Sequence, residues 1–201
     1  PVDVMGLNGV AQITSGAFKT HICILTSTGG VKCWGDNRYG MLANGSTLDS
    51  AVPVDASGLP SGNRAVATGL RSTCVLTGSG GVQCWGYNQF GNLGNNSHID
   101  SLSPVDVVGL TSGISKVSVG SDHACALTSS GGVKCWGKGD YGQLGNGNTD
   151  GSLVPVDVIN LSSGVVAISA GFNHTCALTT SGGVKCWGSG QHGEVGNGSS
   201  S

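Results

Sequence analysis

Eight cysteines are the residues of this sequence best suited to chemistry, and they form four regularly spaced pairs. The members of each pair are ten residues apart, and the pairs recur every 51 residues: Cys23 and Cys33, Cys74 and Cys84, Cys125 and Cys135, and Cys176 and Cys186. Zinc ligands usually come as two close CxxC pairs, and no CxxC occurs here. We therefore predict four disulfides, and the alternative is four pairs of reduced, buried thiols.

The spacing within each pair fits a hairpin that brings the two sulfurs together. In the third copy, two short alternating segments flank a Ser/Gly turn at 129–131. If that turn is a three-residue loop, Cys125 faces Cys135 at a non-hydrogen-bonded pair, where side chains of antiparallel strands approach most closely. This arrangement has the geometry that a disulfide can bridge.

Histidine and tryptophan recur with the same period. His21, His123 and His174 each lie two residues before a cysteine, but Ser72 occupies that position in the second copy. A ring of metal ligands is one hypothesis; the broken set and the lack of matching carboxylates favour hydrogen bonds to the backbone. One tryptophan per copy is more typical of packing between repeats than of a binding platform. These residues are Trp34, Trp85, Trp136 and Trp187.

Groups for enzyme catalysis are scarce. Glu194 is the single glutamate, and no GxSxG, HExxH or phosphate-binding loop occurs. Asp49, Asp100 and Asp150 lie in loops beside Asn and Ser, which raises a calcium site as an alternative, although the dense acidic spacing of such sites is missing. We predict a protein that is not an enzyme and that uses no cofactor and no metal.

Composition limits the partners and the compartment. The nine Lys and Arg are scattered and the formal charge is −2, which disfavours nucleic acid as a partner. No apolar run reaches the 18 residues or more of a membrane span, so no membrane insertion is expected. Paired cysteines indicate an oxidising, extracytoplasmic location: secreted, cell-surface or periplasmic.

The whole chain repeats with the period of the cysteines, in units of approximately 1–52, 53–103, 104–154 and 155–201. The 37 glycines and the alternating apolar segments favour short strands and tight turns. In the third repeat we expect strands at 116–119, 124–128 and 133–136, with a fourth at 154–158. A period near 50 residues with four strands predicts an all-β, propeller-type array of four four-stranded antiparallel blades.

The chain ends suggest how the last blade is completed. The segment after Trp187 contains no fourth strand, whereas Val2, Asp3 and Val4 match a fourth strand that has no blade before it. An unpaired strand edge is a liability that proteins usually close. We expect the N-terminal strand to complete the last blade, either in the same chain or in a neighbouring one.

The repeats resemble a known family. The pattern GxxHxCALTxxGGVKCWGxxxxGxLGNG, carried by Gly120, His123, Trp136, Gly142 and Leu144 and their equivalents, is similar to the repeat of the regulator of chromosome condensation, in its bacterial, extracellular-type members. The resemblance implies a β-propeller that binds other proteins through one face. It leaves open whether these four repeats are the whole array or part of a longer propeller.

Variation among the repeats points to a binding face. In a meander, the loop between the first and second strands and the loop between the third and fourth strands emerge on the same side. These loops vary between repeats, whereas the turn between the second and third strands is nearly constant. Loops that mix aromatic and charged residues are typical of interfaces. The predicted partner-binding residues are Phe18, Lys19, Arg71, Tyr87, Asp122, Lys138, Phe172 and His192.

Two functions follow from these features of the sequence. The first is a non-enzymatic, extracytoplasmic protein-interaction scaffold. The second is a structural subunit in which strand exchange through Val2, Asp3 and Val4 joins copies into a ring or a filament. The expected partner is therefore another protein or further copies of the same chain.

Overall fold

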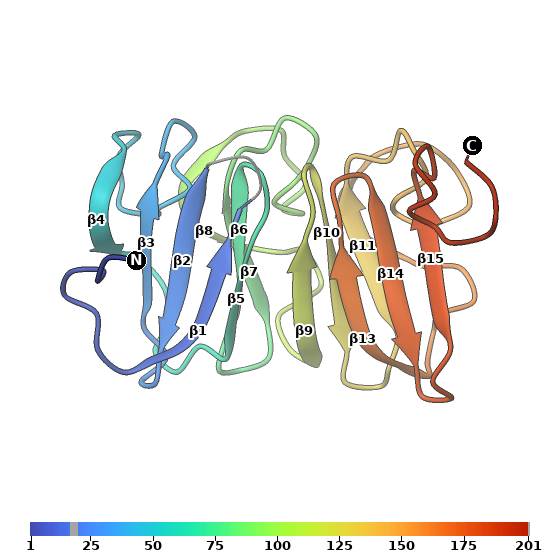
Figure 1. The fold of residues 1–201 in the computed structure, drawn as a ribbon, viewed down its shortest axis with the longest axis horizontal. Helices are drawn as coiled ribbons and strands as arrows, with labels where there is room; N and C mark the ends of the chain where they lie inside the picture. The colour runs from blue at the N-terminus through green and yellow to red at the C-terminus, as the bar shows by residue number, and fades with distance from the viewer. Residues whose placement is uncertain (17–19, 201) are drawn as a thin grey trace.

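The computed structural model describes residues 1–16 and 20–200, and within these ranges it contains fifteen β-strands and no helix (Figure 1). Nothing in the described residues is a helix long and apolar enough to cross a membrane. The predicted all-β architecture is confirmed. Each expected strand of the third repeat is present, with its bounds moved by no more than two residues.

The strands form four antiparallel sheets that follow one another along the chain. The first sheet contains β1 (Val10–Ser15), β2 (His21–Thr26), β3 (Val31–Gly35) and β4 (Ser50–Asp55). The second contains β5 (Ala65–Thr68), β6 (Ser72–Leu76), β7 (Val82–Gly86) and β8 (Ser101–Asp106). The third contains β9 (Ile114–Val119), β10 (His123–Thr128), β11 (Val133–Gly137) and β12 (Ser152–Asp157). The fourth contains β13 (Val165–Ala170), β14 (His174–Thr179) and β15 (Val184–Gly188).

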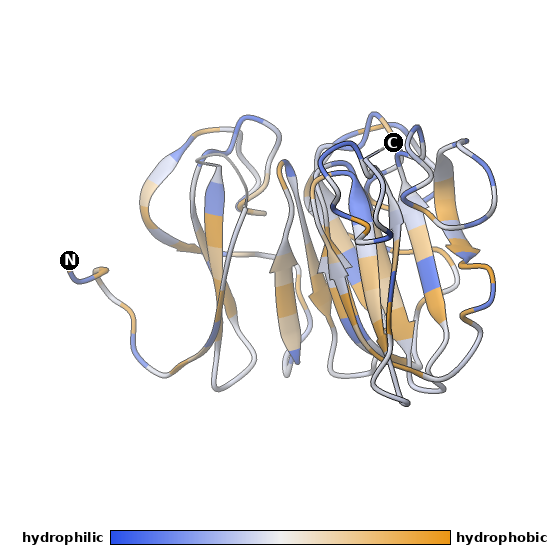
Figure 2. Cartoon of the chain, turned by 45° about the vertical axis from the view of Figure 1, so that its right-hand side comes forward, coloured by the Kyte–Doolittle hydropathy of each residue, from blue (hydrophilic) through white to orange (hydrophobic). Residues whose placement is uncertain are grey.

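Each sheet is a meander, and the four sheets are blades that stand side by side from one end of the molecule to the other (Figure 1). The first strands of neighbouring blades, β1 with β5, β5 with β9 and β9 with β13, contact one another and form the inner side of the array. Successive side chains of a strand point to opposite faces of the sheet. One face of each central hairpin, formed by the second and third strands, therefore lies against the next blade. In Figure 2 the strands carry orange bands interrupted by blue ones, and the loops are mainly white or blue with shorter orange stretches.

The hydrophobic core lies between blades, in three separate clusters. The cluster between the third and fourth blades combines Leu127 and Val133 of one blade with Val165, Ala177 and Trp187 of the next. The other two neighbouring pairs of blades contain equivalent clusters. A single blade therefore cannot bury its own apolar face.

The cysteine pairs are disulfides in all four blades. In the register of the central hairpins, Cys23 lies opposite Cys33, and the other three pairs match in the same way. Their Cα atoms are 4.0 to 4.1 Å apart. The described residues contain no free cysteine.

Trp85, Trp136 and Trp187 pack between blades, as the repetition of tryptophan predicted. Trp85 and Trp136 are fully buried. The indole N–H of Trp85 donates to the carbonyl oxygen of Met41 at 2.7 Å, and that of Trp136 donates to Asn92 at 2.9 Å. Each hydrogen bond crosses to the preceding blade, so it satisfies the one polar atom of a large buried ring.

The N-terminal segment does not complete the fourth blade within this chain, contrary to one of the two arrangements expected. The fourth sheet has three strands, and residues 1–4 form none. The segment is at the opposite end of the molecule from β15 (Figure 1), and in Figure 2 it leads away from the blades. Val2 is 93% exposed. The second and third blades lie between the first blade, from which this segment leads, and the fourth, so the segment and β15 do not pair.

We predict that removing an interior disulfide destabilises the protein more than removing the terminal one. The two disulfides close loops of equal, short length, so each stabilises the folded protein by about 3 kcal/mol by restricting the unfolded chain. Cys125 and Cys135 are fully buried, whereas the fourth-blade pair is half-buried. The double variant Cys125→Ala/Cys135→Ala should therefore also lose packing that Cys176→Ala/Cys186→Ala retains.

Urea unfolding monitored by tryptophan fluorescence would measure both double variants. Equal losses in the free energy of unfolding would show that the interior pair contributes nothing beyond loop closure.

Candidate functional site

The predicted binding face exists as one side of the molecule, formed by two sets of loops. One set follows β1, β5, β9 and β13, and the other follows β3, β7, β11 and β15; together we call them the loop face. A backbone hydrogen bond joins the two sets in every blade, for example from Tyr87 N–H to the Arg71 carbonyl at 2.9 Å and from Lys138 N–H to Asp122 at 2.8 Å. The loop face is on the upper side of Figure 1.

A glycine at the end of each third strand allows this contact. Gly86 has a φ of +103°, and a Cβ atom there would lie 2.5 Å from the Arg71 carbonyl oxygen. Any other residue would be strained by its backbone conformation and would collide with the neighbouring loop. The backbone that carries the side chains of Arg71 and Tyr87 is therefore held in one conformation.

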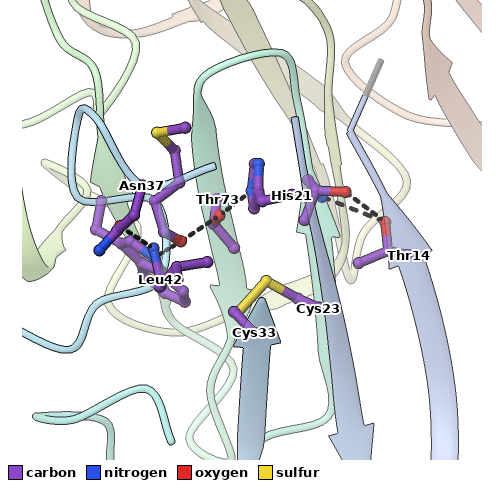
Figure 3. Close-up of a disulfide and its surroundings, with 10 residues drawn as sticks. Thr14, His21, Cys23, Cys33, Asn37, Leu42 and Thr73 are labelled. Atoms are coloured by element: carbon purple, nitrogen blue, oxygen red, sulfur yellow. Dashed lines mark hydrogen bonds between the residues drawn. A yellow bond between two sulfur atoms is a disulfide. The ribbon is translucent and has the colours of Figure 1, made fainter. Parts of the chain in front are cut away.

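Asparagine side chains hold the longer loops in shape. The amide nitrogen of Asn88 donates to Asn95 Oδ1 and to the carbonyls of Ser97 and Ile99, and its Oδ1 accepts the N–H of Leu93. Asn37 does the same in the first blade, where Figure 3 shows its contact with Leu42. Because these amides are buried and satisfied, the loops keep one conformation.

Five side chains from three blades meet on the loop face, and we call them the aromatic cluster: Tyr39, Arg71, Tyr87, Phe90 and Lys138. The Arg71 guanidinium lies 5.9 Å from the Tyr39 ring and 5.2 Å from the Tyr87 ring, and the two rings meet edge to face at 4.9 Å. Phe90 extends the cluster to Lys138, whose ammonium lies 4.9 Å from its ring. Such cation–π contacts fix the two cations over aromatic faces.

The electrostatics of the cluster leave Arg71 available to an outside anion. Among residues 1–16 and 20–200, Arg71 forms no ion pair, whereas Lys138 contacts Asp140 at 3.3 Å. Partial burial raises the pKa of Tyr87, and the nearby Arg71 opposes that rise. Tyr87 therefore stays a neutral hydrogen-bond donor.

The other predicted partner-binding residues are more scattered. Asp122 accepts hydrogen bonds from Ser121 and from Asn92 of the preceding blade. Phe172 lies at the inner ends of the blades, and His192 contacts Glu194 within its own loop. Phe18 and Lys19 lie outside the described residues. Of the predicted set, the structure brings together Arg71, Tyr87 and Lys138, and it places Asp122 next to Lys138.

Tyr39 and Phe90 belong to the cluster but were not among the site residues predicted from the sequence. They occupy the same position in successive loops, four residues after Gly35 and Gly86. Tyr141 and His192 hold that position in the last two blades. A comparison of equivalent loop positions could have found them.

A hollow of about 490 Å³ lies at the inner ends of the blades. It is lined where β1, β5, β9 and β13 end, by residues that include Gly16, Leu70, Ser121 and Phe172. The part of its wall that the structure describes consists mainly of glycine, alanine, serine and threonine, with Leu70, Val119 and Phe172.

His21 and His123 bind the next blade through side chains, which corrects the backbone role expected for them. Nε2 of His21 lies 2.7 Å from the Thr73 hydroxyl, which donates to the Met41 carbonyl at 3.2 Å (Figure 3). Because that hydroxyl gives its proton to the carbonyl, Nε2 is the donor to Thr73. His123 and Thr175 repeat this arrangement at 2.9 Å.

No metal-binding cluster of three or more His, Cys, Asp or Glu occurs among the described residues. Asp49 and Asp100 accept the backbone N–H groups of Asn37 and Asn88, at 2.8 and 2.7 Å. In these two loops the aspartates support the loop conformation, as the asparagines do.

Comparison with known proteins identifies the repeat. One model of the Regulator of chromosome condensation (RCC1) repeat matches residues 10–40, 64–92, 114–143 and 165–194, which is more than half of the chain. A second model with the same description matches 79–127 and 130–178. The chain belongs to the RCC1 repeat family. The predicted membership of this repeat family is confirmed, and the narrower assignment to its bacterial, extracellular-type members stays a prediction.

RCC1-repeat relatives are longer than this chain. It is 34% identical to the human E3 ubiquitin-protein ligase HERC2 over 98% of the chain and 4% of the relative. It is also 34% identical to the Arabidopsis thaliana Ultraviolet-B receptor UVR8, over the full chain and 46% of the receptor. The chain therefore spans less than half the length of each.

Solved structures confirm the propeller fold. Prp20p from Saccharomyces cerevisiae matches with a TM-score of 0.84 at 21% identity, over 98% of this chain and 49% of that one. Human WBSCR16 matches with a TM-score of 0.84 at 25% identity, over 98% and 52%. Prp20p is described as having binding properties toward Gsp1p and histones.

We predict that the buried histidines make the protein less stable in mild acid. Burial is the main cause that lowers the pKa of His21 and of His123 from 6.5 to about 4; Asp36 partly opposes it at His21, and His174 adds to it at His123. Between pH 6.5 and 4 the unfolded chain therefore binds protons that the folded chain does not. The free energy of unfolding should fall as the pH falls, by about 3 kcal/mol per histidine in total, and level off below pH 4.

The interface between the second and third blades provides the matched control for this prediction, because Ser72 and Ala124 occupy the positions of the histidine and the threonine there. The double variant His123→Ser/Thr175→Ala should lose about half of the pH dependence in urea unfolding between pH 7 and 4. An unchanged slope would assign the acid sensitivity to other groups.

Proposed function

We propose that this chain is a protein-interaction scaffold that binds its partner through the loop face, with the aromatic cluster at the centre of the contact. The observation that carries the proposal is Arg71, which lies over two tyrosine rings without a carboxylate partner among the described residues. Arginine and tyrosine are the residue types that most often dominate binding energy at protein interfaces.

The chemistry of the cluster favours an acidic segment of a partner. A carboxylate approaching Arg71 would form a charge-assisted hydrogen bond, and the rings beside it would shield that bond from water. Apolar atoms of the same segment would pack against Phe90, which is 39% exposed. The rigid loops lower the entropic cost of ordering this surface when it binds.

The proposed activity is non-catalytic binding. Propellers of RCC1 repeats are typically interaction modules, and the described lining of the hollow at the inner ends of the blades is mainly backbone and small side chains. The ligase description of HERC2 applies to a protein of which this chain matches 4%, so it provides no support for ligase activity here.

We propose an extracytoplasmic setting for this scaffold. The support comes from the four disulfides, one in the central hairpin of every blade. Disulfides persist in oxidising compartments and are rare where thiols are kept reduced.

Selection of peptides on the immobilised chain would test the binding face. A displayed random peptide library should yield binders rich in Asp and Glu. The double variant Arg71→Ala/Tyr87→Ala should weaken their binding at least tenfold, about 1.4 kcal/mol or more. Arg64→Ala is the matched control, since this exposed arginine precedes β5 at the opposite end of the blade and carries the same charge.

If the selected peptides bind the double variant as tightly as they bind Arg64→Ala, the aromatic cluster is excluded as the binding site. Loss of folding would be detected separately, because the buried tryptophans give a fluorescence signal that is independent of binding.

A second function, assembly by strand exchange, is supported by the two ends of the array. The fourth sheet lacks an outer strand beside β15, and the exposed residues Val2, Asp3 and Val4 repeat the Val-Asp pattern that ends β4, β8 and β12. Addition of such a strand to the edge of β15 in another copy would extend the sheet across the contact. Repetition of this contact would give a ring or a filament.

Light scattering would test strand exchange. The full chain should form oligomers, and a chain starting at Leu7 should be monomeric at the same concentration. A double variant, Val2→Asp/Val4→Asp, should also be monomeric, because the added charges oppose strand pairing. Equal masses for all three proteins would exclude strand exchange.

A further inference from the structure

The loop that follows β11 departs from the loops at the same place in the first two blades. Those loops are held by an asparagine and an aspartate, such as Asn88 and Asp100 in the second blade. In the third blade Gly139 and Gly151 occupy the two positions. Asn146 Oδ1, whose equivalent in the second blade accepts from Asn88, is buried without a partner among the described residues. This loop therefore lacks the amide and the carboxylate that brace its neighbours.

A pocket of about 310 Å³ lies beside this loop, and we call it the outer pocket. The second and third blades both line it, through Gln89, Phe90, His98, Lys138, Asp140, Gly151 and Leu153. Between the first and second blades, Tyr87 holds the position of Lys138, and its ring packs on Tyr39 at a centroid distance of 4.9 Å. A lysine side chain is narrower than a phenol ring, so it leaves room that a tyrosine would fill. The volume is at the small end of the range for ligand sites.

The outer pocket combines a cation with an anion, so its charge is balanced. Lys138 Nζ lies 3.3 Å from Asp140 Oδ2 and 4.9 Å from the centroid of the Phe90 ring. Both charged side chains are partly accessible, at 23% and 62%. A hydroxyl group can accept from the ammonium and donate to the carboxylate at the same time. A charged ligand would be attracted by one of the two groups and repelled by the other.

His98 and Gln89 add two further acceptors to the pocket. Nδ1 of His98 lies 2.8 Å from the Gln89 carbonyl oxygen, so Nδ1 carries the proton and Nε2 of the neutral ring accepts. The amide nitrogen of Gln89 donates to the His98 carbonyl at 3.2 Å, which leaves Oε1 as an acceptor. Neither Nε2 nor Oε1 has a hydrogen-bond partner among the described residues. The two reciprocal hydrogen bonds hold both side chains in place.

Phe90 and Leu153 form the apolar part of the wall. Phe90 is 39% exposed. Leu153 approaches the Phe90 loop closely, because a Cβ atom on Gly91 would lie 2.7 Å from Leu153 Cδ2. An apolar wall beside a rim of donors and acceptors complements a pyranose ring, whose C–H bonds form its faces and whose hydroxyl groups project from its edge.

We propose that the outer pocket binds a neutral sugar, as a single pyranose or as the terminal residue of a glycan. The apolar wall contacts one face of the sugar ring. Lys138 and Asp140 bind two adjacent hydroxyl groups, and His98 accepts from a third. The missing braces of the loop are consistent with a binding site, because natural proteins depart from local structural rules mainly where function requires it.

This sugar site is separate from the binding of an acidic segment proposed above. The two share Phe90 and Lys138, but Arg71 is not part of the outer pocket. The variant Arg71→Ala should therefore leave sugar binding unchanged, whatever its effect on acidic peptides.

NMR titration with methyl glycosides of glucose, galactose, mannose and N-acetylglucosamine would test the site. At least one of them should shift the amide signals of Gln89, Phe90 and Asp140. The dissociation constant should be about 1 mM, because a small polar ligand gains little binding energy per atom. The methyl glycoside of glucuronic acid, which adds a carboxylate, should bind no more tightly than that of glucose.

Two variants should each weaken glycoside binding by about tenfold or more. Lys138→Tyr introduces the side chain that the second blade carries at this position, and it fills the pocket. Asp140→Ala removes a hydroxyl acceptor. Asp55→Ala is the matched control, since this exposed aspartate also pairs with a lysine, Lys32, at 2.6 Å. Tryptophan fluorescence would verify that every variant is folded.

Three results would each overturn the proposal. The first is the absence of shifts with every neutral glycoside at about 20 mM, well above the expected dissociation constant. The second is equal binding by Lys138→Tyr, Asp140→Ala and Asp55→Ala. The third is tighter binding of the glucuronic acid glycoside than of the glucose glycoside, which would assign the pocket to an anion.

Discussion

The structure depends on a constraint that applies to every blade: a four-stranded meander has two faces, and it can bury them only against neighbouring blades. The three hydrophobic clusters all lie between blades, and each combines leucine, valine and cysteine from one hairpin with a tryptophan from the next. The indole N–H of each such tryptophan reaches a carbonyl of the preceding blade, which fixes the rotation of one blade against the other. The fixed geometry of the loop face follows from this repeated contact.

Local features of the fold could be predicted from the sequence because a turn determines them. A three-residue loop sets the register of the hairpin, so the opposition of Cys125 and Cys135 followed from counting outward from the turn. The loop face followed from the order of strands in a meander, because alternate connections must emerge on the same side. Both conclusions use only residues that are close in the sequence.

Contacts between blades were harder to predict, because they depend on how far one sheet turns relative to the next. Comparison of equivalent positions showed that His21 and Ser72 differ, but it did not show that His21 faces a residue 52 positions later in the next blade. The aromatic cluster was missed in part for the same reason. Arg71 reaches Tyr39 of the preceding blade only because the two loops lie side by side. Whether the N-terminal segment could complete the fourth sheet also depended on the distance between the two chain ends.

The position of the disulfides has a mechanical consequence. Every disulfide joins the second and third strands of one blade, and none joins two blades. A force that pulls the two ends of the array apart would therefore be resisted by a covalent bond inside each central hairpin. Between neighbouring hairpins it would be resisted only by side-chain packing and hydrogen bonds. Under load the array should lengthen in steps, one interface at a time, with each ruptured blade keeping a short crosslinked loop that limits its extension and speeds its return.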